Sequence, residues 1–437
     1  MLKKFHTLLA AAVCSLSLIS NAACAAEPAF QAISITKVFG DGQKPAAAAL
    51  LYPQNIDPAT VTESNYSAAG QRIISAHTNS SPSLTDKNVP GPYVILRFAY
   101  ENSTPMTMPP RTPGQKPAAE IDGGKLRPEN DTHRQEPQRD LSVTVTQTGA
   151  VNGMDGTVYY PQPAGVRSDK RIDLVLEDFC LLQYYDRQTD ATIPYSLYLP
   201  KNYSLSKKYP LLFFISDAGA NSDDPICNLT RGNGATIWAE PQEQDKHECI
   251  ILAPQYTTQL INKLGALTTD DNVWSDGLTL VENLLMHIIR SYNIDTDRIY
   301  GTGQSQGCMT NIAISDKYPE LFTAQLLIAG QWNPEEMAAM KDKKLWIVVC
   351  EGDTKAYPGM NAAVAKWEEL GSKVAKSPMW NSTAAPAEIA RLAERTLRQN
   401  CKINYTVLQG GSHQYTWSVA YNYAPLRDWL FAQTKNN

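Results

Sequence analysis

The amino-acid sequence predicts an α/β protein, with a mostly parallel sheet flanked by helices, preceded by a small all-β sandwich. After about residue 176, short apolar segments alternate with amphipathic helical segments, a pattern typical of a parallel sheet covered on both faces. Before that point, β-branched segments alternate in polarity without helical periodicity, as in sandwich strands. The chain has 437 residues, more than one hydrophobic core usually serves, so we expect two folded domains.

The N-terminal region, 27–175, is expected to form the sandwich. A segment at 102–140 rich in proline and polar residues interrupts it and is expected to be a long irregular loop. The expected strands are 32–39, 93–100, 141–148 and 156–160.

The C-terminal region, 176–437, is expected to form the α/β domain. Ser275 and Asp276 open an expected helix, whose apolar residues recur at helical spacing from Leu278 to Ile288. In parallel sheets, reactive groups collect on loops at the carboxyl ends of the strands. The expected strands are 211–215, 250–253, 298–302, 324–329, 345–350 and 404–408.

The first 26 residues have the pattern of a secretory signal peptide. Lys3 and Lys4 precede an apolar run at 8–19, and small residues follow. We therefore expect an exported protein, periplasmic or extracellular; a lipid anchor on Cys24 is the less favoured alternative. No later stretch approaches the ~20 apolar residues of a membrane helix, so no membrane insertion is expected.

Composition excludes several classes of function. Apolar residues make up 43% of the chain and charged residues 19%, as in ordinary soluble proteins. The net charge of −5 argues against nucleic acid as a partner, because polyanions select basic faces. No C-x-x-C pair is present, so we expect no metal site and no thioredoxin-like redox site. Disulfides are possible in an exported chain, although the sequence does not choose a pairing among Cys180, Cys227, Cys249, Cys308, Cys350 and Cys401.

One motif points to nucleophilic catalysis. Gly303-Gln304-Ser305-Gln306-Gly307 follows an expected strand and precedes an expected helix. This is the G-x-S-x-G nucleophile elbow of α/β-hydrolases, in which glycines allow a strained turn that exposes the serine. The alternative is an ordinary Gly-Ser turn.

A serine hydroxyl needs a base, and histidine titrates in the useful range. His413 follows an expected strand and precedes the final helical segment, which suits the chain order Ser, acid, His; the alternative is a helix cap. The other histidines lie in the leader, in the β region, before the elbow or within a helix: His6, His77, His133, His247 and His287.

The orienting acid is expected after a strand between Ser305 and His413. Glu351-Gly352-Asp353 follows the strand at 345–350. Asp353 is the preferred acid and Glu351 the reserve, while a solvated acidic turn is the alternative. Such an acid holds the imidazole tautomer and stabilises the imidazolium.

An oxyanion hole needs two backbone donors. We expect Gln306, which follows the nucleophile, to supply one. Ala218, in Ser-Asp-Ala-Gly-Ala at 216–220, is expected to supply the other. Three aromatic residues near the expected site, Tyr357, Tyr415 and Trp417, either line a substrate pocket or pack in the core.

Further segments carry a resemblance to a known family. They are Ile-Pro-Tyr-Ser-Leu-Tyr-Leu-Pro-Lys-Asn-Tyr at 193–203, Tyr-Pro-Leu-Leu at 209–212, Ala-Pro-Gln at 253–255, Tyr-Asn-Ile-Asp at 292–295 and Arg-Asp-Trp-Leu-Phe at 427–431. With the elbow, they resemble secreted bacterial esterases of the α/β-hydrolase superfamily that carry an immunoglobulin-like N-terminal domain. These are relatives of polyhydroxyalkanoate depolymerase-like and prolyl-oligopeptidase-like hydrolases.

The resemblance implies an ester-cleaving domain without a cofactor, and a β domain that helps to shape the active site. By position, Ser305, Asp353 and His413 match the family's triad. The family's usual His-Gly-Ala-Gly is replaced by Ser-Asp-Ala-Gly at 216–219, and an inward-pointing Asp217 would oppose an oxyanion.

The sequence therefore predicts a serine carboxylic-ester hydrolase with an acyl-enzyme mechanism. Its expected substrates are short-chain or aryl esters, small or oligomeric. Two alternatives stay open: a serine peptidase of related fold, and a non-catalytic binding protein with an idle hydrolase domain. The oligomeric state is not predicted.

Overall fold

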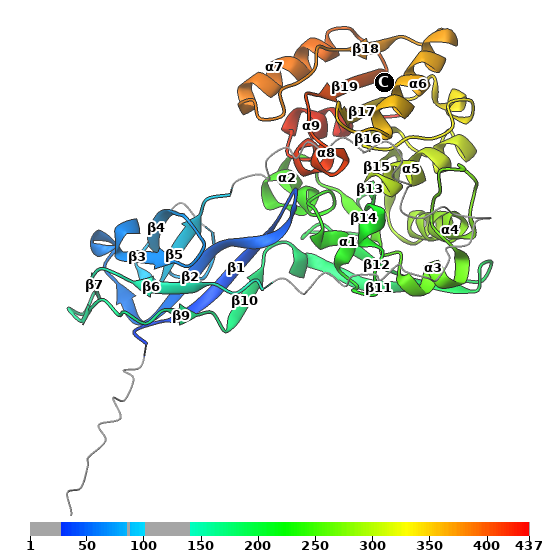
Figure 1. Cartoon of the computed structure of the whole chain (residues 1–437). Helices are drawn as coiled ribbons and strands as arrows, with labels where there is room; N and C mark the ends of the chain where they lie inside the picture. Colours follow the sequence, from blue (N-terminus) through cyan, green and yellow to red (C-terminus); the bar gives the residue numbers. More distant parts are fainter. Residues whose placement is uncertain (1–27, 85–87, 101–139, 437) are drawn as a thin grey trace, which may run out of the picture.

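The computed structural model describes residues 28–84, 88–100 and 140–436. The expected leader at 1–26 and nearly all of the proline-rich segment lie outside these residues. The described chain forms an N-terminal all-β body and a larger body with helices on both faces of a sheet (Figure 1).

The N-terminal body is a sandwich built on a five-stranded sheet with the order β10-β1-β2-β5-β4. Leu50 and Val94 from this sheet and Val145 from a three-stranded sheet, β3-β6-β9, share one buried cluster. The strands are β1 (Gln31–Phe39), β2 (Gly42–Ile56), β3 (Tyr66–Ala68), β4 (Ile73–Asn79), β5 (Gly91–Phe98), β6 (Thr144–Gln147), β7 (Val151–Asn152), β8 (Val158–Tyr159), β9 (Val166–Arg167) and β10 (Lys170–Asp173).

The longest strand of the sandwich was not expected from the sequence. β2 contains a run of alanines, which have low strand propensity, yet Ala47, Ala48 and Ala49 are fully buried. Pro45 lies where the β1–β2 register shifts, the kind of irregularity at which a strand tolerates proline. Conversely, the strand expected at 156–160 is only the two-residue β8.

The second body contains a nine-stranded sheet with the order β11-β12-β14-β13-β15-β16-β17-β19-β18. β11 and β12 form an antiparallel hairpin, β12 is antiparallel to β14, and the remaining pairs are parallel. The expected fold class is thus confirmed. The strands are β11 (Phe179–Asp186), β12 (Ala191–Tyr198), β13 (Tyr209–Ile215), β14 (Ile250–Pro254), β15 (Ile294–Gln304), β16 (Ala324–Ile328), β17 (Leu345–Cys350), β18 (Val374–Lys376) and β19 (Ile403–Leu408).

Alternate residues of each central strand enter different cores. Leu211 and Phe213 of β13 pack in the cluster beneath α3, α4, α5 and α6, and Leu212 and Phe214 in the cluster beneath α1, α7, α8 and α9. Both faces are therefore covered, which explains the near-continuous apolar character of these strands. The helices are α1 (Cys227–Thr230), α2 (Pro241–Lys246), α3 (Thr258–Leu264), α4 (Asp276–Ser291), α5 (Gln306–Lys317), α6 (Ala356–Glu369), α7 (Pro386–Leu397), α8 (His413–Ala420) and α9 (Ala424–Phe431).

The β1–β2 hairpin reaches from the sandwich to the second body (Figure 1). Val38 is buried in the same cluster as Trp417 of α8. Gly40 approaches α8 so closely that a Cβ atom there would lie 1.8 Å from the carbonyl oxygen of Ser418. Lys37 forms a 2.7 Å ion pair with Glu240. The sandwich is thus packed directly against α8.

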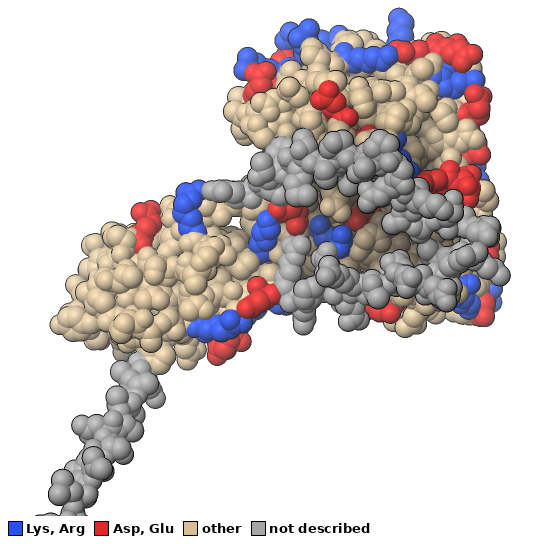
Figure 2. Space-filling view, in the orientation of Figure 1, with Lys and Arg blue, Asp and Glu red and all other residues tan. Residues whose placement is uncertain are grey.

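The six cysteines of the described chain are all free, so no disulfide is formed among them. No helix in the described chain is long and apolar enough to cross a membrane. On the face shown in Figure 2, the described cationic and anionic side chains are interspersed over the larger body.

Candidate active site

Ser305 lies in the sharp turn between β15 and α5. Its backbone has φ 53° and ψ −118°, a conformation that costs about 1–3 kcal/mol for a residue other than glycine. The Ser305 amide donates to the carbonyl oxygen of Ile328 in β16 at 3.1 Å, which holds the turn against the sheet. The side chain is half-buried at the carboxyl end of β15.

The two motif glycines allow this turn to pack against β13. A Cβ atom at Gly307 would lie 1.9 Å from the carbonyl oxygen of Ile215, and one at Gly303 would lie 2.6 Å from Gly307. Neither backbone can move without displacing β13, α5 or both. The sequence motif thus reflects close packing of two strand ends and a helix start.

Three residues expected from the sequence meet in one chain of hydrogen bonds. His413 Nε2 lies 2.8 Å from Ser305 Oγ, and His413 Nδ1 lies 2.5 Å from Asp353 Oδ2. Ser305 follows β15, Asp353 follows β17, and His413 follows β19. The carboxyl ends of three parallel strands therefore bring together residues that are distant in sequence.

Asp353 is a fixed and ionised partner for the imidazole. Its side chain is only 2% exposed, and Oδ1 accepts hydrogen bonds from the amides of Lys355 at 3.1 Å and Ala356 at 2.9 Å. Burial acts to raise the pKa of Asp353, but the hydrogen bond from His413 and these amides outweigh it and leave the pKa below its usual value.

Glu351, the reserve acid, has a different place. It is exposed, and its Oε2 accepts a hydrogen bond from the amide of Gly410 at 3.0 Å. It thus contacts the loop before His413, whereas Asp353 contacts the imidazole itself.

The loop that presents His413 depends on two glycines in left-handed conformation, Gly410 at φ 61° and Gly411 at φ 73°. His413 is the first residue of α8, and Ser412 caps that helix by accepting from the amide of Tyr415. The Trp417 ring meets the imidazole edge-on, with centroids 5.1 Å apart. One turn of α8 therefore orients the ring.

Ala218 and Gln306, the expected oxyanion donors, each open a helical turn. Gln306 opens α5 directly after Ser305, and Ala218 opens the 3-10 helix η4 (Ala218–Ala220) on the loop after β13. Ala218 is exposed, and within the described chain its amide donates to no other group. Both amides thus stand at the starts of helical turns beside the elbow.

The carboxylate of Asp217 is engaged elsewhere. Oδ1 accepts from Gln304 Nε2 at 3.0 Å, Oδ2 accepts from the Gly219 amide at 3.0 Å, and Arg231 Nε lies 3.7 Å from Oδ2. Both carboxylate oxygens therefore have partners within the protein, and the side chain is only 8% exposed. Asp217 therefore organises the loop, and neither Gln304 nor Arg231 has a sequence motif that would have revealed this role.

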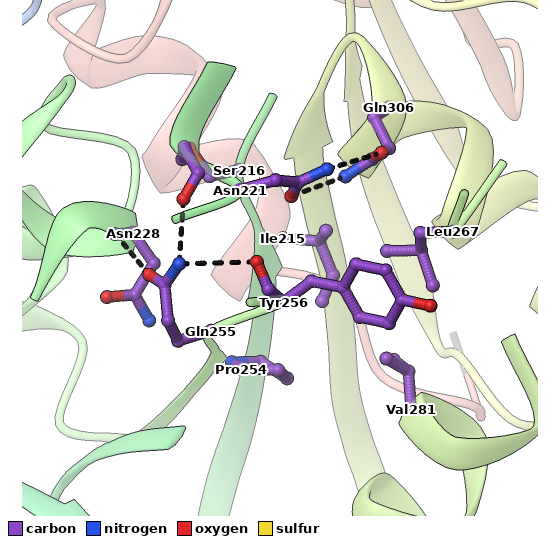
Figure 3. A pocket seen from close by; sticks show the side chains of 11 residues that line it. Ile215, Ser216, Asn221, Asn228, Pro254, Gln255, Tyr256, Leu267, Val281 and Gln306 are labelled. Atoms are coloured by element: carbon purple, nitrogen blue, oxygen red, sulfur yellow. Dashed lines mark hydrogen bonds between the residues drawn. The ribbon is translucent and has the colours of Figure 1, made fainter. Parts of the chain in front are cut away.

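A second link joins this loop to the elbow helix. Asn221 and Gln306 exchange two side-chain amide hydrogen bonds of 3.1 Å (Figure 3). Behind them lies a cavity of about 10 Å³, lined also by Ile215, Gln255 and Tyr256, with room for about one water molecule. Ser305, His413 and Asp353 do not line this cavity.

The three aromatic residues do not form a common pocket. Tyr415 is 4% exposed and its hydroxyl is hydrogen-bonded to Ser382 at 3.1 Å, so the pocket interpretation is wrong for this residue. Trp417 is 5% exposed and contacts the imidazole as described. Tyr357, in the first turn of α6, is half-buried and packs against the core beneath α6.

Comparison with known proteins places these findings in context. Residues 31–160 match the family described as esterase Ig-like N-terminal domain. A thermostable esterase of known structure is similar over 92% of this chain and 99% of its own, with 24% sequence identity and a TM-score of 0.69. No curated protein sequence matches the chain.

Other solved structures are more distant. A ferulic acid esterase from Anaeromyces mucronatus shares 15% identity, with a TM-score of 0.38 over 58% of this chain and 91% of its own. A feruloyl esterase module from Clostridium thermocellum shares 13%, with a TM-score of 0.40 over 57% and 87%.

The fold and the site define an α/β-hydrolase-fold protein with a serine, histidine and aspartate in hydrogen-bonding order. More narrowly, residues 31–160 match the esterase Ig-like N-terminal domain family, and the overall fold is similar to that of the thermostable esterase.

Proposed function

We propose that the protein is a serine carboxylic-ester hydrolase. The observation that carries this proposal is the continuous hydrogen-bonded chain from Ser305 through His413 to Asp353. A binding protein with an idle site would have no need for a strained serine, an aligned imidazole and a buried carboxylate together. The fold shared with an esterase supports the same reaction class.

In the first step, His413 Nε2 takes the proton of Ser305 as Oγ attacks the ester carbonyl carbon. The carbonyl oxygen becomes an oxyanion that the amides of Gln306 and Ala218 stabilise. The imidazolium is stabilised by Asp353, which stays ionised. Collapse of the tetrahedral intermediate breaks the ester C–O bond, and the imidazolium protonates the departing alkoxide.

In the second step, His413 takes a proton from water, and the resulting hydroxide attacks the acyl-serine carbonyl. The second tetrahedral intermediate uses the same two amides. Its collapse breaks the bond to Ser305 Oγ, which regains its proton from the imidazolium. The carboxylic acid leaves, and neither step calls for a cofactor.

Uncrowded acyl groups suit this site best. The cavity beside Gln306 holds about 10 Å³, far below the 300–1,000 Å³ of drug-sized ligand sites. Ser305 and His413 do not line that cavity, so the path proposed for the acyl group is over the exposed residues Ala218 and Gly219. Short-chain and aryl esters satisfy this requirement.

Hydrolysis of p-nitrophenyl esters from acetate to octanoate tests the proposal. Wild-type protein is expected to turn over the short esters fastest. Ser305→Ala and His413→Ala are expected to lower kcat by at least about 10⁴-fold. His287→Ala, on the half-buried side of α4, is the matched control and should retain activity.

The outcomes also separate the alternatives. A folded wild-type protein that cleaves peptide p-nitroanilides faster than esters would indicate a peptidase. No turnover of either class would indicate a binding protein. Esterase activity that survives Ser305→Ala would contradict the mechanism.

A further inference from the structure

A second cluster of ionisable side chains lies at the junction of α2 and α9, away from the triad. Within the described chain, Glu243, His247 and Asp428 place one ligand atom each within 4.8 Å of one another. His247 Nε2 lies 2.8 Å from Asp428 Oδ1 and 3.8 Å from Glu243 Oε1. A single ring nitrogen therefore faces two carboxylates.

One carboxylate oxygen of Glu243 has no hydrogen-bond partner within the described chain. The side chain is 8% exposed, and its Oε2 accepts from Arg427 Nε at 2.7 Å. Oε1 is buried without a hydrogen-bond partner in the described chain and faces His247. His247 Nε2 carries at most one proton and lies nearer to Asp428 Oδ1, at 2.8 Å, than to Glu243 Oε1, at 3.8 Å. A buried carboxylate oxygen without a partner is destabilising.

We propose that Glu243 Oε1, His247 Nε2 and Asp428 Oδ1 bind a divalent transition-metal ion, with Zn²⁺ as the preferred ion. One imidazole nitrogen and two carboxylate oxygens are suitable zinc ligands, at about 2.0–2.2 Å. Tetrahedral coordination at these lengths separates ligand atoms by about 3.4 Å, close to the 2.8 and 3.8 Å present here. The third pair, Glu243 Oε1 and Asp428 Oδ1, lies within 4.8 Å, so shifts on the order of 1 Å would complete the site.

The surroundings hold the ligands in place. Arg427 binds the far oxygen of Glu243 and donates to the carbonyl oxygen of Tyr421, so the near oxygen stays directed at His247. The His247 ring stacks on Phe431, with centroids 4.9 Å apart. Supporting contacts of this kind orient metal ligands.

The charge and the exposure of the cluster also suit a cation. A histidine that ligates a metal is neutral, so two carboxylates and one arginine would leave one net negative charge, which a divalent ion would reverse. Asp428 is 50% exposed, which gives an ion a route of entry and water a place as fourth ligand. The ion would join α2 to α9 and so have a structural role, independent of the proposed hydrolase function.

Calorimetric titration of chelator-treated protein with ZnCl₂ tests the site. We expect about one Zn²⁺ per chain and at least ~10-fold weaker binding in His247→Gln and Asp428→Asn. Asp428 is half-exposed, so Asp428→Asn is expected to fold even if another variant does not. His287→Gln controls for adventitious histidine binding and His413→Ala for binding at the triad; both should retain the site.

Thermal unfolding gives an independent readout, since a ligand that binds only the folded state raises Tm. Zn²⁺ should raise the Tm of wild-type protein and of His413→Ala, but not that of His247→Gln. The proposal is overturned by absence of saturable binding, by equal affinity in Asp428→Asn, or by loss of the site in His413→Ala. A protonated His247 paired with both carboxylates would give the first of these results.

Discussion

Asp353→Asn is the change that most directly tests the roles proposed for the triad. An asparagine oxygen can still accept from the amides of Lys355 and Ala356, as Asp353 Oδ1 does. Its NH₂ group would then face His413 Nδ1, which lies 2.5 Å from the second oxygen in the wild type. The imidazole would have to accept at Nδ1 and carry its proton on Nε2. In that tautomer it cannot take the proton of Ser305.

The expected cost follows from this loss of the productive tautomer. We expect kcat for p-nitrophenyl acetate to fall about 10⁴-fold, with KM changed little. That loss corresponds to about 5 kcal/mol of transition-state stabilisation. At pH 8 the Asp353 carboxyl is ionised in the wild type, because its pKa lies below the usual value. The experiment therefore compares a carboxylate with the neutral amide of asparagine.

Glu351→Gln supplies the matched control for this experiment. It removes a carboxylate from the same turn, one that contacts the His413 loop through the Gly410 amide but not the imidazole. Its kcat should stay within about threefold of wild type, as for an exposed hydrogen bond. Activity within tenfold of wild type in Asp353→Asn, or an equal loss in Glu351→Gln, would refute the assignment of Asp353.

Three further changes have defined outcomes. Ala218→Pro removes the backbone N–H proposed to stabilise the oxyanion, at the first position of a helical turn, where proline is tolerated. Stopped-flow assays should therefore show kcat lowered about 10²–10³-fold, with Tm little changed. An unaltered kcat would exclude Ala218 as a donor. Gly307→Ala places a methyl group 1.9 Å from the Ile215 carbonyl oxygen. Urea unfolding should therefore show that the free energy of unfolding falls by about 3 kcal/mol. An unchanged free energy of unfolding would argue against close packing at the elbow. Asp316 at the end of α5 has both carboxylate oxygens buried without a partner in the described chain, and burial together with Glu336 raises its pKa to about 7. Between about pH 4 and 7 the folded state then holds this proton while the unfolded state has lost it, so the free energy of unfolding should fall as pH rises through that window. Asp316→Asn should remove this pH dependence and stabilise the protein at pH 8. Identical pH–stability curves for the wild type and the variant would contradict the raised pKa.

The sequence was most informative where burial is complete. The strand expected at 345–350 has the same bounds as β17, because six consecutive buried residues leave an uninterrupted apolar run. The nucleophile elbow was recognisable because its glycines are imposed by close packing. By contrast, β2 was missed because its alanines are buried by their neighbours and carry no strand signal of their own.

The candidate site was predictable only where a motif or a strand end marks a residue. Ser305, Asp353 and His413 each follow a strand, and the structure brings all three together. Gln304 and Arg231 act through the carboxylate of Asp217, a relation visible only after folding. The Glu243 and His247 pair has the spacing of one helical turn, but its partner Asp428 comes from the end of the chain, so the sequence analysis predicted no metal.

The contact between the β1–β2 hairpin and α8 also bears on synthesis. Gly40 is synthesised long before Ser418, whose carbonyl oxygen it closely approaches. The sandwich can fold early, but Val38 near the tip of its hairpin stays exposed until α8 and α9 have formed. Contacts between such distant segments slow folding and leave apolar surface exposed in the meantime. Chains truncated before α8 should therefore be bound by chaperones that recognise apolar segments, whereas chains that include α8 and α9 should not.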